Sequence, residues 1–178
     1  GIDHLDIPLI EQQGITWSNA AGCNAQAVSE YVITALLKLQ PELIHANGNF
    51  TLGIIGLGNV GSRLAVMAKL LGWNVIAFDP FETREHINQV DLNTLLKQAD
   101  AISIHVPLTK HGEHPTSHLI NAQALAEMKP NCILINSARG PVVEEVALIA
   151  DIQKTQRQVV LDVFEHEPEI SEELLNLI

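Results

Sequence analysis

The sequence predicts an α/β fold in which helices cover both faces of a parallel β-sheet. Strand-like and helix-like segments alternate along almost the whole chain, which is the pattern of successive β-α-β units joined by right-handed crossovers. Three strand-like segments, 101–104, 132–135 and 159–161, are almost continuously apolar, as strands buried on both faces are. A glycine-rich turn stands directly between a fourth apolar strand and a helix. These observations predict a doubly wound parallel sheet of the Rossmann type.

The first elements are expected ahead of the main sheet. Apolar spacing predicts a helix over about 3–12, a short strand over 15–19 and a long helix from about 24–45. Asn24 is a residue type that favours helix N-termini, so we expect its side chain to cap the long helix. The turn-forming residues around Gly48 should then separate this helix from the next strand.

The remaining elements alternate along the chain. Apolar runs predict the strands, and helical apolar spacing predicts the helices between them. The expected strands are 51–56, 74–78, 101–105, 132–136 and 158–162. The expected helices are 59–71, 92–98, 121–128 and 142–154. The stretch 111–117 shows neither pattern, so we expect an irregular surface loop there.

Composition restricts the classes of function. The chain has 178 residues, 47% of them hydrophobic, which is enough for one well-buried domain. Its net charge is −11 with only ten Lys and Arg, so we expect neither nucleic-acid binding nor attachment to an anionic membrane surface. Two cysteines, and no signal-like N-terminus or apolar run of about 20 residues, favour a cytoplasmic location. The chain begins at Gly1 and stops at Ile178 without a terminating signal, so we expect that both ends are cut.

A glycine fingerprint follows the strand expected at 51–56. Residues 52–61 read Leu-Gly-Ile-Ile-Gly-Leu-Gly-Asn-Val-Gly. Here Gly56 permits a tight turn, Gly58 lets the backbone approach a pyrophosphate, and Gly61 lets the helix pack closely on the strand. The pyrophosphate would lie at the helix N-terminus, where free N–H groups and the helix dipole favour an anion. The spacing therefore predicts a dinucleotide site, against the alternative of a glycine-rich turn in an ordinary α/β domain.

The next strand ends in an acidic residue, Asp79. An acidic side chain at this place accepts hydrogen bonds from the ribose hydroxyls of NAD, and its charge repels the 2′-phosphate of NADP. Arg84 lies close in sequence and weakens that distinction. The unit therefore favours NAD as its cofactor.

Polar residues and loops follow the carboxyl ends of several expected strands. Ligands in open α/β sheets bind at that edge. We therefore expect four groups to converge on one crevice: Asp79, 105–107, 136–140 and Asp162.

Three histidines have a spacing that could suit a metal ion: His111, His114 and His118. They lie in and beside the expected irregular loop, and no pair of carboxylates adjoins them. We expect solvated or hydrogen-bonded histidines and no metal site.

Four stretches together resemble the NAD-dependent D-2-hydroxyacid dehydrogenases, in matching order along the chain. They are the glycine fingerprint at 56–61, His-Val-Pro-Leu-Thr at 105–109, Ile-Asn-Ser-Ala-Arg-Gly at 135–140 and Leu-Asp-Val-Phe-Glu-His-Glu-Pro at 161–168. Parts of 22–32 and 107–119 resemble the branch of that family that oxidises 4-phospho-D-erythronate in pyridoxal 5′-phosphate (vitamin B6) biosynthesis. Two alternatives stay open. One is another D-2-hydroxyacid dehydrogenase, of the phosphoglycerate or glyoxylate/hydroxypyruvate type; the other is a non-catalytic protein that senses NAD.

The resemblance implies catalytic roles. Arg139 would bind the substrate carboxylate and stabilise the developing carbonyl oxygen, and Glu167 would hold and charge-stabilise a catalytic histidine. Glu165 has the wrong spacing for that task. The resemblance also implies that the catalytic histidine lies beyond Ile178. His166 adjoins Glu167, but we expect its side chain to point elsewhere.

The resemblance also implies which residues contact the cofactor. Asp162 would hydrogen-bond the nicotinamide carboxamide, while Ser137, Ala138, Val106 and Pro107 would offer main-chain contacts. With the fingerprint, the expected cofactor residues are Gly56, Gly58, Asn59, Val60, Gly61, Asp79, Val106, Pro107, Ser137, Ala138 and Asp162.

Two domains are implied by the same resemblance. Residues 1–22 would be a remnant of a flavodoxin-like substrate domain, and residues 23–178 the NAD-binding domain with its leading long helix. Relatives pair through the cofactor domain and that helix, so we expect a homodimer. The substrate would be a small phosphorylated 2-hydroxy acid, and the chain alone is expected to be inactive.

Overall fold

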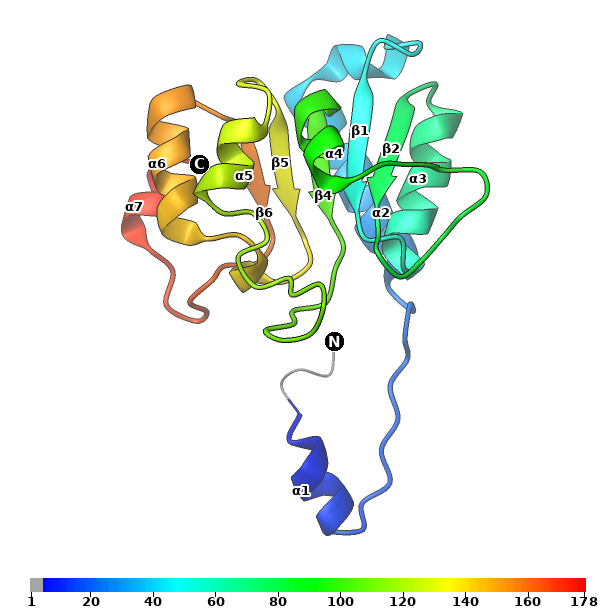
Figure 1. The fold of residues 1–178 in the computed structure, drawn as a ribbon, viewed down its shortest axis with the longest axis vertical. Helices are drawn as coiled ribbons and strands as arrows, with labels where there is room; N and C mark the ends of the chain where they lie inside the picture. The colour runs from blue at the N-terminus through cyan, green and yellow to red at the C-terminus, as the bar shows by residue number, and fades with distance from the viewer. Residues whose placement is uncertain (1–4) are drawn as a thin grey trace.

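The structure, a computed structural model, describes residues 5–178. Its body has a sheet between two layers of helices, and an N-terminal arm extends away from this body (Figure 1). The arm carries the short helix α1 (Ile7–Gln12), in which no residue is buried. Residues 3 and 4 of the expected first helix lie outside the described part of the chain.

Six parallel strands form the sheet in the order β3-β2-β1-β4-β5-β6. Their bounds are β1 (Thr51–Ile55), β2 (Asn74–Phe78), β3 (Asn88–Gln89), β4 (Ala101–Ile104), β5 (Ile133–Asn136) and β6 (Val159–Leu161). β2 and β3 follow β1 on one side of the sheet, and β5 and β6 follow β4 on the other side. This order confirms the predicted doubly wound Rossmann-type sheet. The loops that leave β1 and β4 diverge at this switch point and leave a crevice between them.

Two apolar clusters show which helices cover each face of the sheet. Alternate strand residues point to opposite faces. Leu36 and Leu64 pack with Ile54 on the face of α2 and α3, whereas Leu95 and Ile102 belong to the face of α4, α5, α6 and α7.

No helix of the described part is long and apolar enough to span a membrane. The helix bounds are α2 (Ala25–Leu39), α3 (Asn59–Leu70), α4 (Leu92–Gln98), α5 (Ala122–Glu127), α6 (Glu145–Thr155) and α7 (Glu172–Leu175).

The N-terminal third departs from the prediction at three points. The long helix ends at Leu39 because Pro41 cannot continue it, and a separate 3₁₀ turn, η1 (Pro41–His45), follows. Asn24 precedes the helix, but its side chain makes no capping hydrogen bond, so the expected cap is wrong. The strand expected at 15–19 is also wrong. These residues lie in the arm, where no described strand runs beside them to form a ladder.

The rest of the chain follows the prediction closely. The strand at 74–78 and the helix at 92–98 have the predicted bounds, and most other elements differ by about a residue at each end. The helix predicted from 142 begins at Glu145, because a 3₁₀ turn, η2 (Gly140–Val142), takes up its first residues. The predicted elements did not include β3 and α7, which are too short to show a periodic pattern.

Candidate cofactor-binding site

The turn after β1 has two positions that only glycine can occupy. Gly56 has a φ of +97°, and a Cβ there would lie 2.6 Å from the carbonyl oxygen of His105. Gly61 lies in the first turn of α3, and a Cβ there would lie 1.9 Å from the carbonyl oxygen of Gly56. These glycines let β1, β4 and the start of α3 approach one another backbone to backbone.

Gly58 has a different role. It is the N-cap residue of α3, with extended backbone and no side chain to bond the helix N–H groups. An added Cβ would meet no atom within 4 Å, so the space beside this helix end is open. An anion there would face the first turn, which contains Asn59, Val60 and Gly61, and the positive end of the helix dipole. The turn therefore fits the pyrophosphate of a dinucleotide.

Asp79 follows β2 and holds the turn from the other side. Its Oδ2 accepts a hydrogen bond from the N–H of Leu57 at 2.7 Å. Its Oδ1 accepts from the N–H groups of Phe81 and Glu82 at 2.9 and 3.0 Å. A carboxylate has about four acceptor positions, so capacity remains for a ribose hydroxyl. Asp79 therefore fixes the fingerprint turn and places a negative charge beside it.

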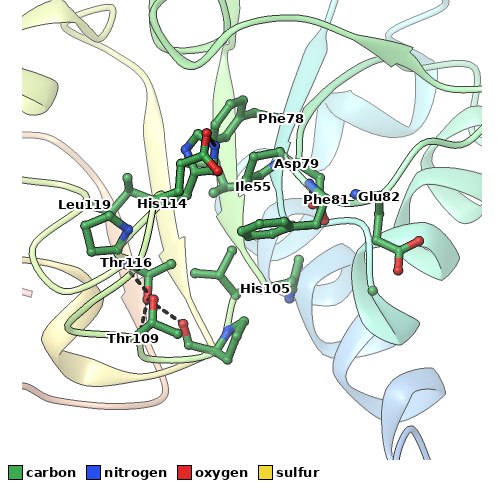
Figure 2. Close-up of a pocket in the computed structure, with 18 of the residues that line it drawn as sticks. Ile55, Phe78, Asp79, Phe81, Glu82, His105, Thr109, His114, Thr116 and Leu119 are labelled. Carbon is green, nitrogen blue, oxygen red and sulfur yellow. Dashed lines mark hydrogen bonds and ion pairs between the residues drawn. The ribbon is translucent and has the colours of Figure 1, made fainter.

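A cavity of about 560 Å³ opens at the carboxyl ends of β1, β2 and β4 (Figure 2). Five of the predicted cofactor residues line it: Gly56, Gly58, Asp79, Val106 and Pro107. Its volume is in the range of cofactor and small-molecule sites. Apolar side chains from the strand ends, such as Ile55 and Phe78, form much of its inner wall. The cavity suits an adenine ring with its ribose directed to Asp79.

The loop between β4 and α5 closes part of this cavity, which the sequence did not indicate. The N–H of Thr109 donates to Oγ1 of Thr116 at 2.8 Å, and the N–H of Thr116 donates to the carbonyl of Thr109 at 3.0 Å. Between them His114 meets Phe81 edge-on, with ring centroids 5.5 Å apart. The loop is irregular, as predicted, but it is also a wall of the site (Figure 2). Its length and its place directly after a strand end were the available signals.

His105 gives this wall a neutral polar group. Its Nε2 lies 2.9 Å from Oγ of the buried Ser103. Burial of the imidazole lowers the pKa of His105 to about 4. The ring is therefore uncharged at neutral pH and presents no positive charge to a ligand.

Arg139 follows β5 in a turn that the side chain of buried Asn136 closes. Oδ1 of Asn136 accepts from the N–H of Ala138 at 3.1 Å, and its Nδ2 donates to the carbonyl of Arg139 at 2.9 Å. The Arg139 guanidinium itself donates to the carbonyl of Ala138 at 2.6 Å. The backbone that carries Arg139 is thus fixed by a residue of the strand end.

Gly140 brings this turn against the segment that follows β6. A Cβ at Gly140 would lie 1.8 Å from the carbonyl oxygen of Phe164, so the two backbones touch. Glu167 lies three residues further along, and its Oε1 accepts from the N–H of Phe164 at 2.7 Å. The predicted catalytic residues Arg139 and Glu167 therefore lie on two segments in direct contact.

Glu165 anchors the same segment to two other elements. One carboxylate oxygen accepts from the N–H of Glu145 at the start of α6 at 2.7 Å, and the other lies 2.5 Å from Nε2 of His118. Burial of Glu165 opposes its ionisation, but the hydrogen bonds from Glu145 and His118 outweigh burial and lower its pKa. Glu165 thus joins the β4–α5 loop and α6 to the segment that carries Glu167. No sequence pattern indicated this link.

Three predicted cofactor residues at the ends of β5 and β6 lie outside the cavity wall: Ser137, Ala138 and Asp162. They are at the same edge of the sheet, because all its strands are parallel. The cavity itself unites only Asp79 with residues 105–107 among the groups expected to converge. The buried hydroxyl of Ser137 makes no hydrogen bond to the described residues, which fits a group that meets a ligand.

Within the described residues, no group of three or more His, Cys, Asp or Glu side chains is arranged to hold a metal ion. His111 and His114 line the cavity, and His118 pairs with Glu165. His114 packs against Phe81, and His118 makes a hydrogen bond.

Comparison with known proteins identifies the family. Residues 29–177 match the family described as D-isomer specific 2-hydroxyacid dehydrogenase, NAD binding domain. The chain belongs to this family. The matched residues include the glycine turn, the cavity and the Arg139 turn, and NAD is the cofactor of this domain.

Two relatives extend the match over the whole chain. The erythronate-4-phosphate dehydrogenase of Acinetobacter baumannii is 68% identical over 178 residues, which are 100% of this chain and 50% of that protein. The erythronate-4-phosphate dehydrogenase of Psychrobacter cryohalolentis is 47% identical over an alignment that covers 99% of this chain and 50% of that protein. The chain therefore spans about half the length of the curated relatives it matches.

Solved structures share the fold. The D-lactate dehydrogenase of Lactobacillus jensenii with NAD⁺ is 29% identical, with a TM-score of 0.80 over 100% of this chain and 60% of that one. The D-lactate dehydrogenase of Aquifex aeolicus complexed with NAD and lactic acid is also 29% identical, with a TM-score of 0.80 over 99% of this chain and 62% of that one.

Proposed function

We propose that this chain is the cofactor-binding half of an enzyme that oxidises 4-phospho-D-erythronate to its 2-oxo acid in pyridoxal 5′-phosphate biosynthesis. The observation that carries the proposal is the 68% identity, over the whole chain, to an erythronate-4-phosphate dehydrogenase. The same identity favours this substrate over those of the phosphoglycerate and glyoxylate/hydroxypyruvate types.

Five residues along the carboxyl edge of the sheet would orient the cofactor. NAD, when bound, supplies an acceptor for the hydride that leaves C2 of the substrate. The open helix end at Gly58 would receive the pyrophosphate, and Asp79 would accept hydrogen bonds from the adenosine ribose. Ser137, Ala138 and Asp162 would hold the nicotinamide end, beyond the cavity.

Arg139 and Glu167 would act on the substrate side. A guanidinium offers two parallel donors to a carboxylate and also stabilises charge on the neighbouring carbonyl oxygen. Glu167 would orient a histidine from the rest of the protein and stabilise it once it has taken the hydroxyl proton. The contact between Gly140 and Phe164 keeps the two segments in a fixed relation, as such a pair requires.

The two predicted domains also enter the proposal, as residues 1–22 and 23–178. Leu9 and Ile15 in the arm are exposed by 50% and 57%, which suits a segment covered by the remaining half of a substrate domain. On the body, Val66 and Leu70 of α3 are exposed apolar residues and suit a homodimer contact through α2 and α3. We place the protein in the cytoplasm.

The test is a steady-state assay of the protein expressed from the complete reading frame that encodes this chain. We expect its kcat/KM with NAD to be highest for 4-phospho-D-erythronate. D-3-Phosphoglycerate and D-glycerate are matched comparisons, because both carry the same 2-hydroxy carboxylate. A higher value for either would favour another dehydrogenase type, and NAD binding without any turnover would favour a sensor.

Arg139→Lys in the same protein tests the role of the guanidinium. An ammonium group loses the two-pronged geometry, so kcat/KM should fall by about 10²-fold or more while NAD affinity changes little. If turnover stayed within a few-fold of wild type, or if NAD binding were lost instead, Arg139 would not be the substrate-binding residue.

A further inference from the structure

Arg84, in the loop between β2 and β3, lies against the cofactor turn. Its Nε donates to Oγ of Ser62 at 3.3 Å, and one of its terminal nitrogens donates to the carbonyl of Leu57 at 3.5 Å. The Ser62 hydroxyl donates to the same carbonyl at 2.5 Å. The guanidinium is therefore held at the start of α3, next to the glycine turn.

Leu57 places this cation close to Asp79. The N–H of Leu57 donates to the Asp79 carboxylate at 2.7 Å, while its carbonyl accepts from Arg84. Arg84 and Asp79 are thus bonded to the two main-chain groups of one residue, Leu57. In NADP-binding members of this fold, an arginine near this position accommodates the 2′-phosphate.

Glu82 offsets the charge of Arg84. Its Oε2 lies 3.1 Å from a terminal nitrogen of Arg84, and the two side chains are 49% and 45% exposed. Glu82 also lines the cavity, beside Asp79 and Phe81 (Figure 2). Arg84 is therefore paired with one carboxylate, and a second, Asp79, is bonded to the N–H of the residue whose carbonyl Arg84 contacts. These three side chains together carry a net negative charge.

We propose that the ion pair of Glu82 and Arg84 is a second determinant of cofactor choice. Arg84 could bind a 2′-phosphate, but its ion pair with Glu82 occupies the guanidinium. A 2′-phosphate that approaches this edge meets the charges of Asp79 and Glu82 and a guanidinium that is already paired. When a neutral side chain replaces Glu82, the guanidinium can form charge-assisted hydrogen bonds with the phosphate. The proposal rests on the NAD site and is independent of which hydroxy acid is oxidised.

Calorimetric titrations of the 178-residue chain with NADH and with NADPH test this proposal. The readout is the ratio of the two Kd values. Glu82→Gln removes the charge and keeps the size of the side chain, and Glu85→Gln makes the same change at an exposed neighbour. The double variant Glu82→Gln/Arg84→Gln shows whether any gain needs the guanidinium. Circular dichroism of each variant checks that the fold is intact.

Glu82→Gln should shift the ratio toward NADPH by about fivefold to tenfold, the effect of removing one exposed charge close to a phosphate. Glu85→Gln should leave the ratio at the wild-type value, and the double variant should lose the gain. A shift in Glu82→Gln no larger than in Glu85→Gln, or a gain that survives in the double variant, would overturn the proposal. Failure of the wild-type chain to bind NADH would overturn the cofactor site and, with it, this proposal.

Discussion

Asp79 combines two roles that a single substitution can separate. It holds the N–H groups of Leu57 and Phe81, and it places a negative charge at the ribose end of the cavity. In Asp79→Ala, NADH affinity should fall by about tenfold to a hundredfold, as for lost hydrogen bonds to a charged acceptor, and NADPH affinity should fall less. Asp79→Asn keeps one acceptor oxygen, so its NADH affinity should lie between those of wild type and Asp79→Ala. Parallel titrations with both cofactors measure the effect, and an unchanged preference in the alanine variant would contradict it.

His105 predicts a dependence of stability on pH. Its pKa is about 4 in the folded chain and 6.5 in an ordinary environment. Between these values the unfolded chain takes up a proton that the folded chain does not. The free energy of unfolding therefore falls as the pH drops from about 6.5 toward 4, by at most about 1.4 kcal/mol per pH unit from this group.

Urea unfolding of His105→Asn at several pH values measures this contribution. Between pH 6.5 and 4, the free energy of unfolding of the variant should fall less steeply than that of wild type. His45→Asn, which makes the same substitution at an exposed histidine, is the matched control. Parallel curves for wild type and His105→Asn would show that His105 is not buried as a neutral group.

At the scale of residues, the sequence predicted what depends on near neighbours. The turn at Gly56 and the close approach at Gly61 follow from spacing alone, and both positions are closed to a side chain. Contacts between residues far apart in the sequence could not be predicted, because such contacts leave no regular spacing in the sequence. Glu165 and His118 are 47 positions apart, and only the fold brings them together.

The start of α6 depends on a carboxylate from another segment. Glu165 accepts from the N–H of Glu145 and pairs with His118, so Glu165→Gln should lower the free energy of unfolding at neutral pH by about 1–2 kcal/mol. The folded pKa of Glu165 is lowered, so its contribution is present above its ordinary value of 4.5 and is lost as the pH falls through the folded pKa.

Denaturant unfolding at neutral and acidic pH measures this link. The difference between wild type and Glu165→Gln should shrink as the pH is lowered below 4.5. Glu169→Gln removes the same charge from an exposed residue of the same segment and should have little effect. A difference that stayed constant into acid would mean that ionised Glu165 does not anchor the helix.

At the scale of elements, periodic patterns predicted the long buried segments and failed for those that depend on a neighbour. The strand at 74–78 was predicted correctly because it is apolar and is paired with a strand on each side. The segment 15–19 has strand-like residues, but a strand also needs a partner, and the arm provides none among the described residues. The long helix was overextended because local apolar spacing continues past Pro41, where the ring stops the helix.

At the scale of the whole molecule, a network of ion pairs lies at the edge of the sheet opposite the binding site. Buried Arg157, just before β6, pairs with Asp151 at 2.6 Å and donates to the carbonyls of Lys129 and Cys132. Asp100, just before β4, pairs with Lys129 at 2.7 Å. The carboxyl edge, by contrast, carries the cavity and the glycine turn. The doubly wound sheet, and the edge at which ligands bind, could be predicted from the α/β pattern, whereas this network of side chains could not.

The most direct test of the cofactor site is a calorimetric titration of the 178-residue chain and of its Gly58→Ala variant with NADH. A methyl group at Gly58 meets no described atom within 4 Å, so the variant should fold normally, with a Tm within about 2 °C of wild type. The same methyl group would occupy the space assigned to the pyrophosphate. We therefore expect wild type to bind NADH and the variant to lose affinity by about tenfold or more. Equal NADH binding by the two proteins, or no binding by wild type, would contradict a dinucleotide site at this helix end.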